Sequence, residues 1–197
     1  MWDSRFAQDG YAYGTTPNDF LVSLSTQLPK GKVLSIGEGE GRNATYLASL
    51  GYNVTAVDGS IVGLEKAAKL AEQRGAKLET IHADLADFDM GKERWSAIIS
   101  IFCHLPKPLR KKVLRNAIEG LVDGGVLLLE AYSPRQLIFG TGGPKTEEFL
   151  VDPNDLRMEL EGLSFEHFQA IDREIHEGQL HNGMSAVVQV FARKRTG

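Results

Sequence analysis

The sequence has little of several features that would mark particular classes of protein. It contains one cysteine, Cys103, in 197 residues, which excludes an internal disulfide and is typical of a reducing compartment. No run of about 18 apolar residues occurs, so we expect no membrane-spanning helix. The first residues lack the apolar core of a signal peptide, and repeats and low-complexity tracts are missing. These absences predict a cytoplasmic protein without membrane association.

Neither positive nor negative charge is in large excess. The 22 lysines and arginines nearly balance the 26 aspartates and glutamates, for a net charge of −4. This balance argues against a nucleic-acid partner held by phosphate contacts, and we interpret the basic residues between Lys107 and Arg115 as a solvated helix face. Apolar residues at 42% and charged residues at 24% are typical of globular proteins. The length suits one core, so we expect a single domain over residues 1–197.

The stretch from residue 33 to residue 58 reads as strand, glycine turn, helix and strand. Such a unit is right-handed and leaves a crevice at the carboxyl ends of its parallel strands. Glycines in the turn let a ligand approach the backbone, and Asp58 at the tip of the second strand can accept hydrogen bonds from two ribose hydroxyls. The unit therefore predicts a site for an adenosine-containing ligand. The apolar runs are residues 33–36 and 54–57, and the turn glycines are Gly37, Gly39 and Gly41.

The spacing of these glycines separates two kinds of ligand. A dinucleotide fingerprint is G-x-G-x-x-G, in which the third glycine packs the helix against the strand. Here Arg42 stands at the third position, and the pattern is G-x-G-x-G. Glu38 and Glu40 would repel a pyrophosphate, but they suit a ligand with ammonium and sulfonium charges. Arg42 can pair with a carboxylate on that ligand, or it is a solvated helix start.

These residues resemble motif I of the class I methyltransferases that use S-adenosylmethionine (SAM), especially the branch that includes the bacterial tellurite-resistance methyltransferases. The segment GEGEGRNATYLASLGYNVTAVDGS (37–60) carries the likeness, which continues through SIFCHLP (100–106), DGGVLLLEAY (123–132) and GMSAVVQVFARK (183–194). The resemblance covers most of the chain. One departure is Ser35, because the family usually has an acid there that is thought to help hold the SAM amino group. Glu38 is the candidate to replace it.

The resemblance implies SAM as the cofactor, S-adenosylhomocysteine (SAH) as the product, and a set of binding positions. In the family an acidic residue after the third strand meets the adenine amino group, and Asp84 and Leu85 fit that place. The glycine turn would admit the methionine part of SAM, and Asp58 would hold the ribose. The cofactor-binding residues expected from the resemblance are Gly37, Glu38, Gly39, Gly41, Arg42, Asn43, Asp58, Gly59, Ser60, Asp84, Leu85 and Ser100.

Residues 1–28 combine a loose arm with a helix that Asn18 or Asp19 can cap. In the resembled family this N-terminal piece folds over the SAM site. The resemblance therefore implies a lid, with Tyr13 or Asn18 as its contact residue.

Histidines supply the remaining candidates. His104 follows the fourth predicted strand at the mouth of the crevice, where it would contact the acceptor, and it is the candidate catalytic residue. His176, Glu177 and His181 lie in a predicted hairpin; they can reach the acceptor side, or they are solvated turn residues. Their spacing matches no metal-binding motif, so we predict no metal site.

Alternating strand-like and helix-like segments up to residue 132 predict a parallel sheet covered on both faces. Residues 133–149 are rich in glycine and turn formers and predict a long loop. Residues 165–174 and 185–193 then read as two strands joined through HEGQLHNG. With the resemblance, the predicted fold is α/β and Rossmann-like, with a seven-stranded, mostly parallel sheet and an antiparallel C-terminal hairpin.

The leading hypothesis is a SAM-dependent methyltransferase that acts on a small-molecule acceptor by in-line transfer. The leaving group is a neutral thioether, so positioning and exclusion of water can supply most of the catalysis. A non-catalytic module that binds SAM or SAH is the alternative, motivated by Ser35. A nicotinamide oxidoreductase is a third hypothesis, which Arg42 in place of glycine argues against. The sequence indicates neither the acceptor nor the oligomeric state.

Overall fold

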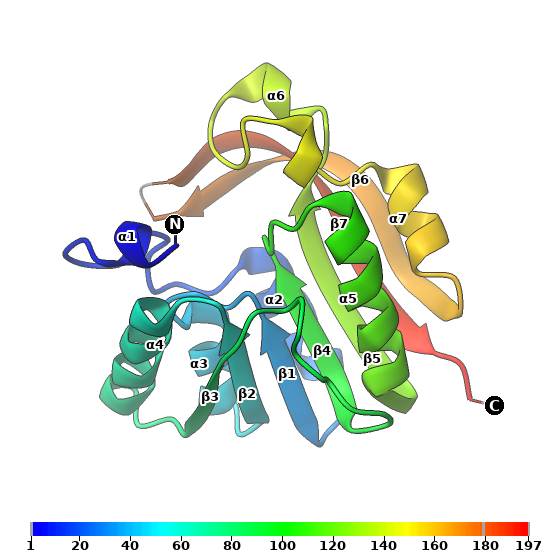
Figure 1. Cartoon of the computed structure of the whole chain (residues 1–197), viewed down its shortest axis with the longest axis horizontal. Coiled ribbons are helices and arrows are strands. Elements are labelled where there is room, and N and C mark those ends of the chain that lie inside the picture. The colour runs from blue at the N-terminus through cyan, green and yellow to red at the C-terminus, as the bar shows by residue number, and fades with distance from the viewer. Residues whose placement is uncertain (1, 179, 197) are drawn as a thin grey trace.

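Seven strands form one sheet in the computed structural model, which describes residues 2–178 and 180–196. The strand order is β3-β2-β1-β4-β5-β7-β6; the first five strands are parallel, and β7 is antiparallel to both neighbours (Figure 1). This order confirms the predicted sheet. The strands are β1 (Lys32–Ile36), β2 (Asn53–Asp58), β3 (Leu78–His82), β4 (Trp95–Ile101), β5 (Leu121–Tyr132), β6 (Leu163–Glu177) and β7 (His181–Lys194).

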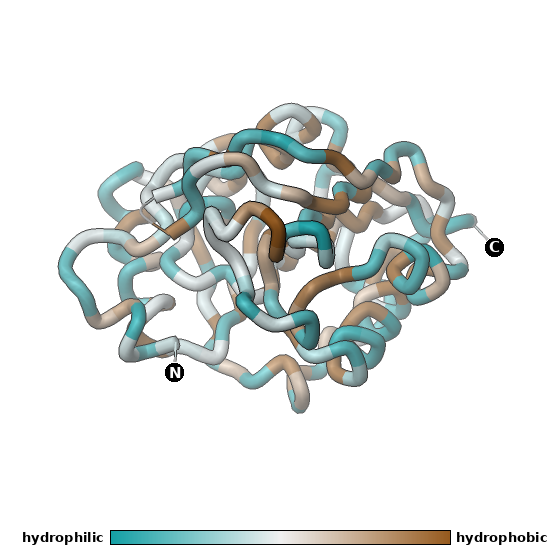
Figure 2. Tube along the Cα trace, turned by 90° about the horizontal axis from the view of Figure 1, so that it is seen from above, coloured by the Kyte–Doolittle hydropathy of each residue, from teal (hydrophilic) through white to brown (hydrophobic). Residues whose placement is uncertain are grey.

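Helices cover both faces of the sheet, as predicted. Val33 of β1 belongs to one apolar cluster with α2, α3 and α4, whereas Leu34 belongs to a second with α5 and α7, and alternate strand residues face opposite sides. In Figure 2 most outer loops are hydrophilic, and hydrophobic stretches lie mainly inside the trace. The helices are α1 (Trp2–Phe6), α2 (Asp19–Leu24), α3 (Arg42–Ser49), α4 (Ile61–Gln73), α5 (Lys107–Gly120), α6 (Gln136–Phe139) and α7 (Pro153–Glu159).

Capping residues explain where several helices begin. Asn18, as predicted, and also Ser60 and Asp152 accept a hydrogen bond from a backbone N–H in the first turn of α2, α4 and α7. α3 follows Gly41, which has no side chain to cap it. The Glu38 side chain accepts the free backbone N–H groups of that helix instead.

Three segments differ from the predictions. α1 is helical because Phe6 packs into the interior and Asp3 binds the Ser60 hydroxyl at the start of α4. β6 and β7 pair as far as Glu177 and His181, so the turn between them is shorter than HEGQLHNG. The expected long loop after residue 132 contains α6 and a 3₁₀ turn at Glu147–Phe149.

The carboxyl ends of β1, β2 and β4 meet at one edge of the sheet, and the N-terminal arm (residues 2–17) lies over them (Figure 1). The arm also touches the hairpin tip, because a Cβ at Gly178 would lie 2.4 Å from the backbone carbon of Tyr13. Only glycine permits that backbone contact. The arm and the hairpin together therefore close over this edge. Among the described residues, no helix has both the length and the apolarity to cross a membrane.

Candidate functional site

The glycine turn after β1 presents bare backbone. Gly37, Gly39 and Gly41 have φ angles of 61°, 62° and 88°, which residues with a Cβ rarely adopt. A Cβ at Gly37 would also lie 2.6 Å from Cys103 Sγ. One at Gly41 would lie 2.4 Å from the Ala67 Cβ. Both the backbone conformation and the close neighbours therefore require glycine here.

Asp58 ends β2 and faces this turn. Its Oδ2 accepts a hydrogen bond from the Gly39 N–H at 2.8 Å, and its Oδ1 accepts one from the Ser60 N–H at 2.8 Å. Burial raises the pKa of Asp58, against the lowering effect of these two backbone hydrogen bonds. A carboxylate has about four acceptor positions. Asp58 therefore keeps capacity for two hydroxyl groups.

Glu38 lies beside Ser35, the position at which the resembled family has its acid. Its Oε1 accepts hydrogen bonds from the N–H groups of Asn43 at 3.0 Å and Ala44 at 2.9 Å, and its Oε2 contacts the Ser35 hydroxyl. Burial raises the pKa of Glu38, and the hydrogen bonds from Ala44 and Ser35 oppose this. The Glu38 carboxylate, three residues after the family's usual acid position, thus has a structural role as a cap of α3. Its contact with the SAM amino group stays a prediction.

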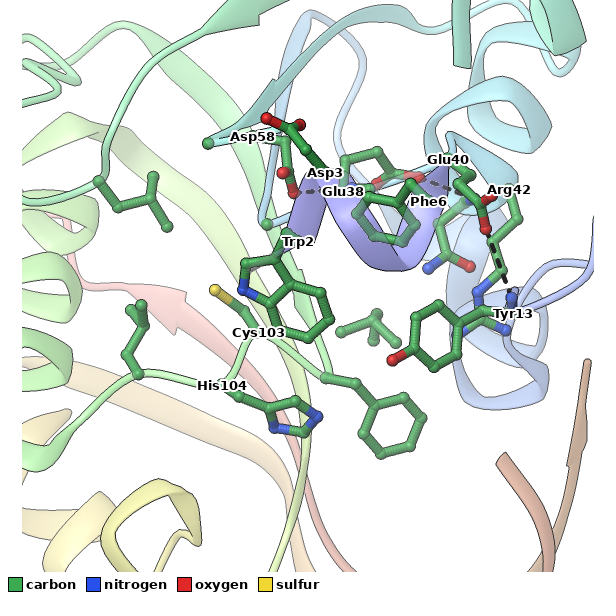
Figure 3. Close-up of a pocket in the computed structure, with 18 of the residues that line it drawn as sticks. Trp2, Asp3, Phe6, Tyr13, Glu38, Glu40, Arg42, Asp58, Cys103 and His104 are labelled. Atoms are coloured by element: carbon green, nitrogen blue, oxygen red, sulfur yellow. Dashed lines mark hydrogen bonds between the residues drawn. The ribbon is translucent and has the colours of Figure 1, made fainter. Parts of the chain in front are cut away.

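A cavity of about 680 Å³ opens at this edge of the sheet (Figure 3). Its volume is typical of small-molecule sites. At one end the turn after β3 contributes Asp84, whose Oδ1 accepts the Ala86 N–H at 2.8 Å, and the buried Leu85. Most of the predicted cofactor-binding residues line the cavity: Gly37, Glu38, Gly39, Arg42, Asn43, Asp58, Gly59, Asp84 and Leu85.

The structure places three predicted cofactor-binding residues outside this lining. Gly41 packs on Ala67, where it allows α3 to approach α4. Ser60 caps α4. Ser100 lies within β4, where it pairs with Leu129 of β5. These three residues serve the fold at their positions. A sequence motif contains such structural residues together with ligand-binding ones and does not distinguish them.

Glu40 holds the N-terminal arm in place. Its Oε2 accepts the N–H groups of Ala12 at 2.7 Å and Tyr13 at 3.4 Å, and its Oε1 pairs with Lys66 Nζ at 3.0 Å. The side chain is buried, although the sequence suggested a residue facing a cationic ligand. Glu40 thus connects the glycine turn to the arm.

Two aromatic residues of α1 enter the cavity. Trp2 and Phe6 stack with ring centroids 5.8 Å apart, and Figure 3 shows the Trp2 ring beside Cys103 and His104. Neither residue is recognisable in the sequence as part of the site, because α1 is too short to show a helical pattern. Burial raises the pKa of the Cys103 thiol to about 12, so it is not a nucleophile at neutral pH.

A cluster of charged side chains, which we call the buried charge cluster, adjoins the cavity at Arg42; it consists of Arg42, Glu130, Arg173 and Glu177, bridged by Asn18, and its most exposed member, Arg173, is 16% exposed. Arg42 Nη2 is 2.6 Å from Glu177 Oε2, and Arg173 donates to both oxygens of Glu130 at 2.9 and 2.8 Å. Asn18 Nδ2 donates to Glu130 Oε2 at 2.6 Å and to Glu177 Oε1 at 2.8 Å. Two cations balance two anions, as buried charges require. Arg42 is therefore not a solvated helix start, and the predicted lid residue Asn18 lies in this cluster.

Four rings line the cavity beside this cluster, and we call them the ring cluster: Tyr13, Phe102, His104 and His181. The centroid of the His181 ring lies 4.5 Å from that of Tyr13 and 4.9 Å from that of Phe102. Burial lowers the pKa of His104 to about 3 and also lowers that of His181. Both imidazoles are therefore neutral at pH 7. The predicted lid residue Tyr13 and the predicted catalytic residue His104 thus occupy one wall.

The three hairpin candidates for the acceptor side, His176, Glu177 and His181, do not share one location. His176 is exposed and binds Asn182 at 2.9 Å and Glu174 at 3.1 Å, outside the cavity lining. Glu177 is buried, and His181 lines the cavity. Successive strand residues point to opposite faces, so His176 and Glu177 cannot both face the cavity.

The sequence alone could have indicated that Glu130 belongs to a buried ion pair. It is a single acid inside the apolar run VLLLEAY of β5, and its side chain is fully buried. An acid in a buried strand needs a partner. That rule predicts a cationic partner without identifying Arg173.

The cavity fits SAM on two observations. Arg42 Nη1 is buried without a hydrogen-bond partner among the described residues, so it can receive a carboxylate, and Asp58 can accept ribose hydroxyls. The sheet order with an antiparallel β7, the bare glycine turn and the carboxylate ending β2 are the features of the Rossmann-like fold of class I methyltransferases.

Comparisons with known proteins agree. Residues 33–125 match the family model for a methyltransferase domain. A glycine/sarcosine N-methyltransferase of Aphanothece halophytica is 28% identical over 134 residues, which are 66% of this chain and 50% of the relative. The chain thus spans about half the length of the curated relatives it matches first.

Solved structures show the same fold. TehB from Haemophilus influenzae superposes with a TM-score of 0.75 at 22% identity, covering 90% of this chain and 62% of TehB. The N-methyltransferase NodS from Bradyrhizobium japonicum WM9, in complex with SAH, superposes with a TM-score of 0.72 at 14% identity, covering 99% of this chain and 97% of NodS.

Proposed function

We propose that this chain transfers the methyl group of SAM to a small-molecule acceptor. The observation that carries the proposal is the continuity of one cavity from Asp58 and the glycine turn to the ring cluster. When bound, SAM supplies an electrophilic methyl group on a sulfonium. Asp58 would orient the ribose, and Arg42 Nη1 would receive the methionine carboxylate.

The chain's own contribution is mainly positioning and exclusion of water. The arm, fixed by Glu40, and the hairpin tip at Gly178 cover the cavity. A covered site strengthens the electrostatic interactions inside it and keeps the reacting groups aligned. The size of the cavity and its partial cover favour a small acceptor over a macromolecule. A single cysteine and the acidic net charge support a cytoplasmic location without a nucleic-acid partner.

Isothermal titration calorimetry with SAM and with SAH tests the proposal. We expect binding of both ligands, and SAH formation when a suitable acceptor is present. Absence of heat at millimolar ligand would remove the proposal. Binding without SAH formation on any acceptor would instead favour the non-catalytic module that Ser35 suggested.

A further inference from the structure

The acceptor end of the cavity has a distinctive chemical character. Its walls are rings, and its two histidines are neutral. The nearest carboxylate, Glu177, is already paired with Arg42 at 2.6 Å. The two guanidinium groups near the rings are already engaged: Arg42 is assigned to the SAM carboxylate, and the exposed Arg5 donates a hydrogen bond to the Tyr13 hydroxyl at 2.8 Å. Ring walls with neutral imidazoles accommodate a flat, uncharged group.

His181 packs in this wall between the rings of Tyr13 and Phe102. Its Nδ1 lies 3.8 Å from Glu177 Oε2, an electrostatic contact that is longer than a hydrogen bond, so Nε2 is the nitrogen on the ring edge away from Glu177, in a side chain that lines the cavity. Glu177 is itself fixed by Arg42 and Asn18. The carboxylate can therefore stabilise a positive charge that forms on the imidazole.

A neutral acceptor that gains a methyl cation must lose a proton. Resting on the proposed function, we propose that His181, oriented by Glu177, takes that proton from a planar aromatic acceptor bearing an S–H or O–H group. The methyl carbon–sulfur bond of SAM breaks as the new bond to sulfur or oxygen of the acceptor forms. The acceptor proton moves to His181 Nε2, and the products are SAH, the methylated acceptor and an imidazolium. Glu177 is a positioning residue in this scheme.

The groups around His181 set its protonation. Glu177 of β6 favours the imidazolium, whereas Arg42 of α3 and Arg5 of α1 oppose it. His104 after β4 is neutral, and the Tyr13 and Tyr132 rings pack against the imidazole. Burial lowers the pKa of His181, so the base form is present at neutral pH.

The test compares two flat thiols in a SAH-release assay at about pH 7.5. Thiophenol is mostly thiolate at this pH and needs no base, whereas benzyl thiol is mostly protonated. For His181→Asn we expect kcat with benzyl thiol to fall by roughly 100-fold or more, but kcat with thiophenol to fall by less than about 5-fold. His181→Gln repeats the measurement in case the first variant folds poorly. His176→Asn, an exposed histidine of the same hairpin, is the matched control.

The readouts separate this proposal from the proposed function. SAM affinity of the His181 variants, measured by calorimetry, should stay within about two-fold of the unmodified protein. An equal loss with both thiols would show a structural role for His181 and overturn the proposal. So would SAM binding without transfer to either thiol or to phenol, or transfer to selenite or an alkylamine alone. Failure of the unmodified protein to bind SAM would count against the proposed function itself.

Discussion

Asp58 uses one carboxylate for two purposes. Two backbone N–H groups hold it against the glycine turn, and its remaining acceptor positions face the cavity. A residue of this kind is visible in the sequence because it ends an apolar strand at a fixed distance from a glycine motif.

We predict that Asp58→Ala weakens SAM binding by roughly 1–3 kcal/mol, because ribose hydroxyls lose their acceptor. Titration calorimetry checks the change. Asp89→Ala is the control, since Asp89 also accepts a backbone N–H, from Gly91 at 2.8 Å, but lies outside the cavity lining. Unchanged affinity in the Asp58 variant would contradict the assignment.

Glu177 should make stability depend on pH at the acid end. Burial would raise its pKa, but the neighbouring His181 imidazole and the charge of Arg42 outweigh burial and lower the pKa from 4.5 to about 2. A lowered folded-state pKa contributes stability above the unfolded pKa of 4.5, and that contribution is lost as the pH falls toward 2.

Urea unfolding at several pH values between 5 and 2 measures this contribution. We expect the unmodified protein to lose on the order of 3 kcal/mol more than Glu177→Gln over that range. The variant is less stable at pH 7, because Arg42 then lacks a charged partner, but its pH slope is shallower. Parallel slopes for the two proteins would contradict the lowered pKa.

At the scale of elements, the N-terminal arm is the part that the sequence described least well. Its contacts come from partners distant in sequence: Glu40 to Ala12, and Gly178 to Tyr13. A five-residue helix such as α1 has too few turns to show periodicity. By contrast, α4 carries its cap and a full apolar face within thirteen residues. Local signals predicted α4, and tertiary contacts determine α1.

We predict that Glu40→Gln loosens the arm and speeds release of SAM, because two backbone N–H groups and Lys66 lose a charged acceptor. Hydrogen exchange of the amides of residues 10–14 should rise, and the SAM dissociation rate in stopped flow should increase several-fold. Glu65→Gln, an exposed acid on α4, is the control. Unaltered exchange in the arm would show that other contacts hold it.

For the molecule as a whole, the sheet and its two apolar layers could be predicted from the sequence. The segments β1, β4 and β5 are mostly apolar runs, which are typical of strands buried on both faces. The cofactor end of the cavity was accessible through its glycine motif. The pairing of Arg42 with Glu177 was not, because their separation in the chain gives no local pattern. The extent of β6 and β7 was also missed, since polar residues alternate along β6.

We predict one cooperative unfolding transition to which both apolar layers contribute. Phe191→Ala, at a fully buried position of β7, should lower the free energy of unfolding by about 3–5 kcal/mol. Met158→Ala on the exposed face of α7 should change it by less than about 1 kcal/mol. Urea unfolding followed by circular dichroism and by fluorescence checks both the size and the coincidence of the transitions.

The buried charge cluster has a consequence for how this chain can diverge. A substitution at Arg42 or Glu130 alone leaves Glu177 or Arg173 without its opposite charge, and one at Asn18 removes the donor to two buried carboxylates, so sequence change there must be concerted. Among descendants we expect these positions, with Arg173 and Glu177, to vary together or not at all. The rings of the ring cluster form no ion pairs with one another, so single substitutions there can change the preferred acceptor without leaving a charge unpaired.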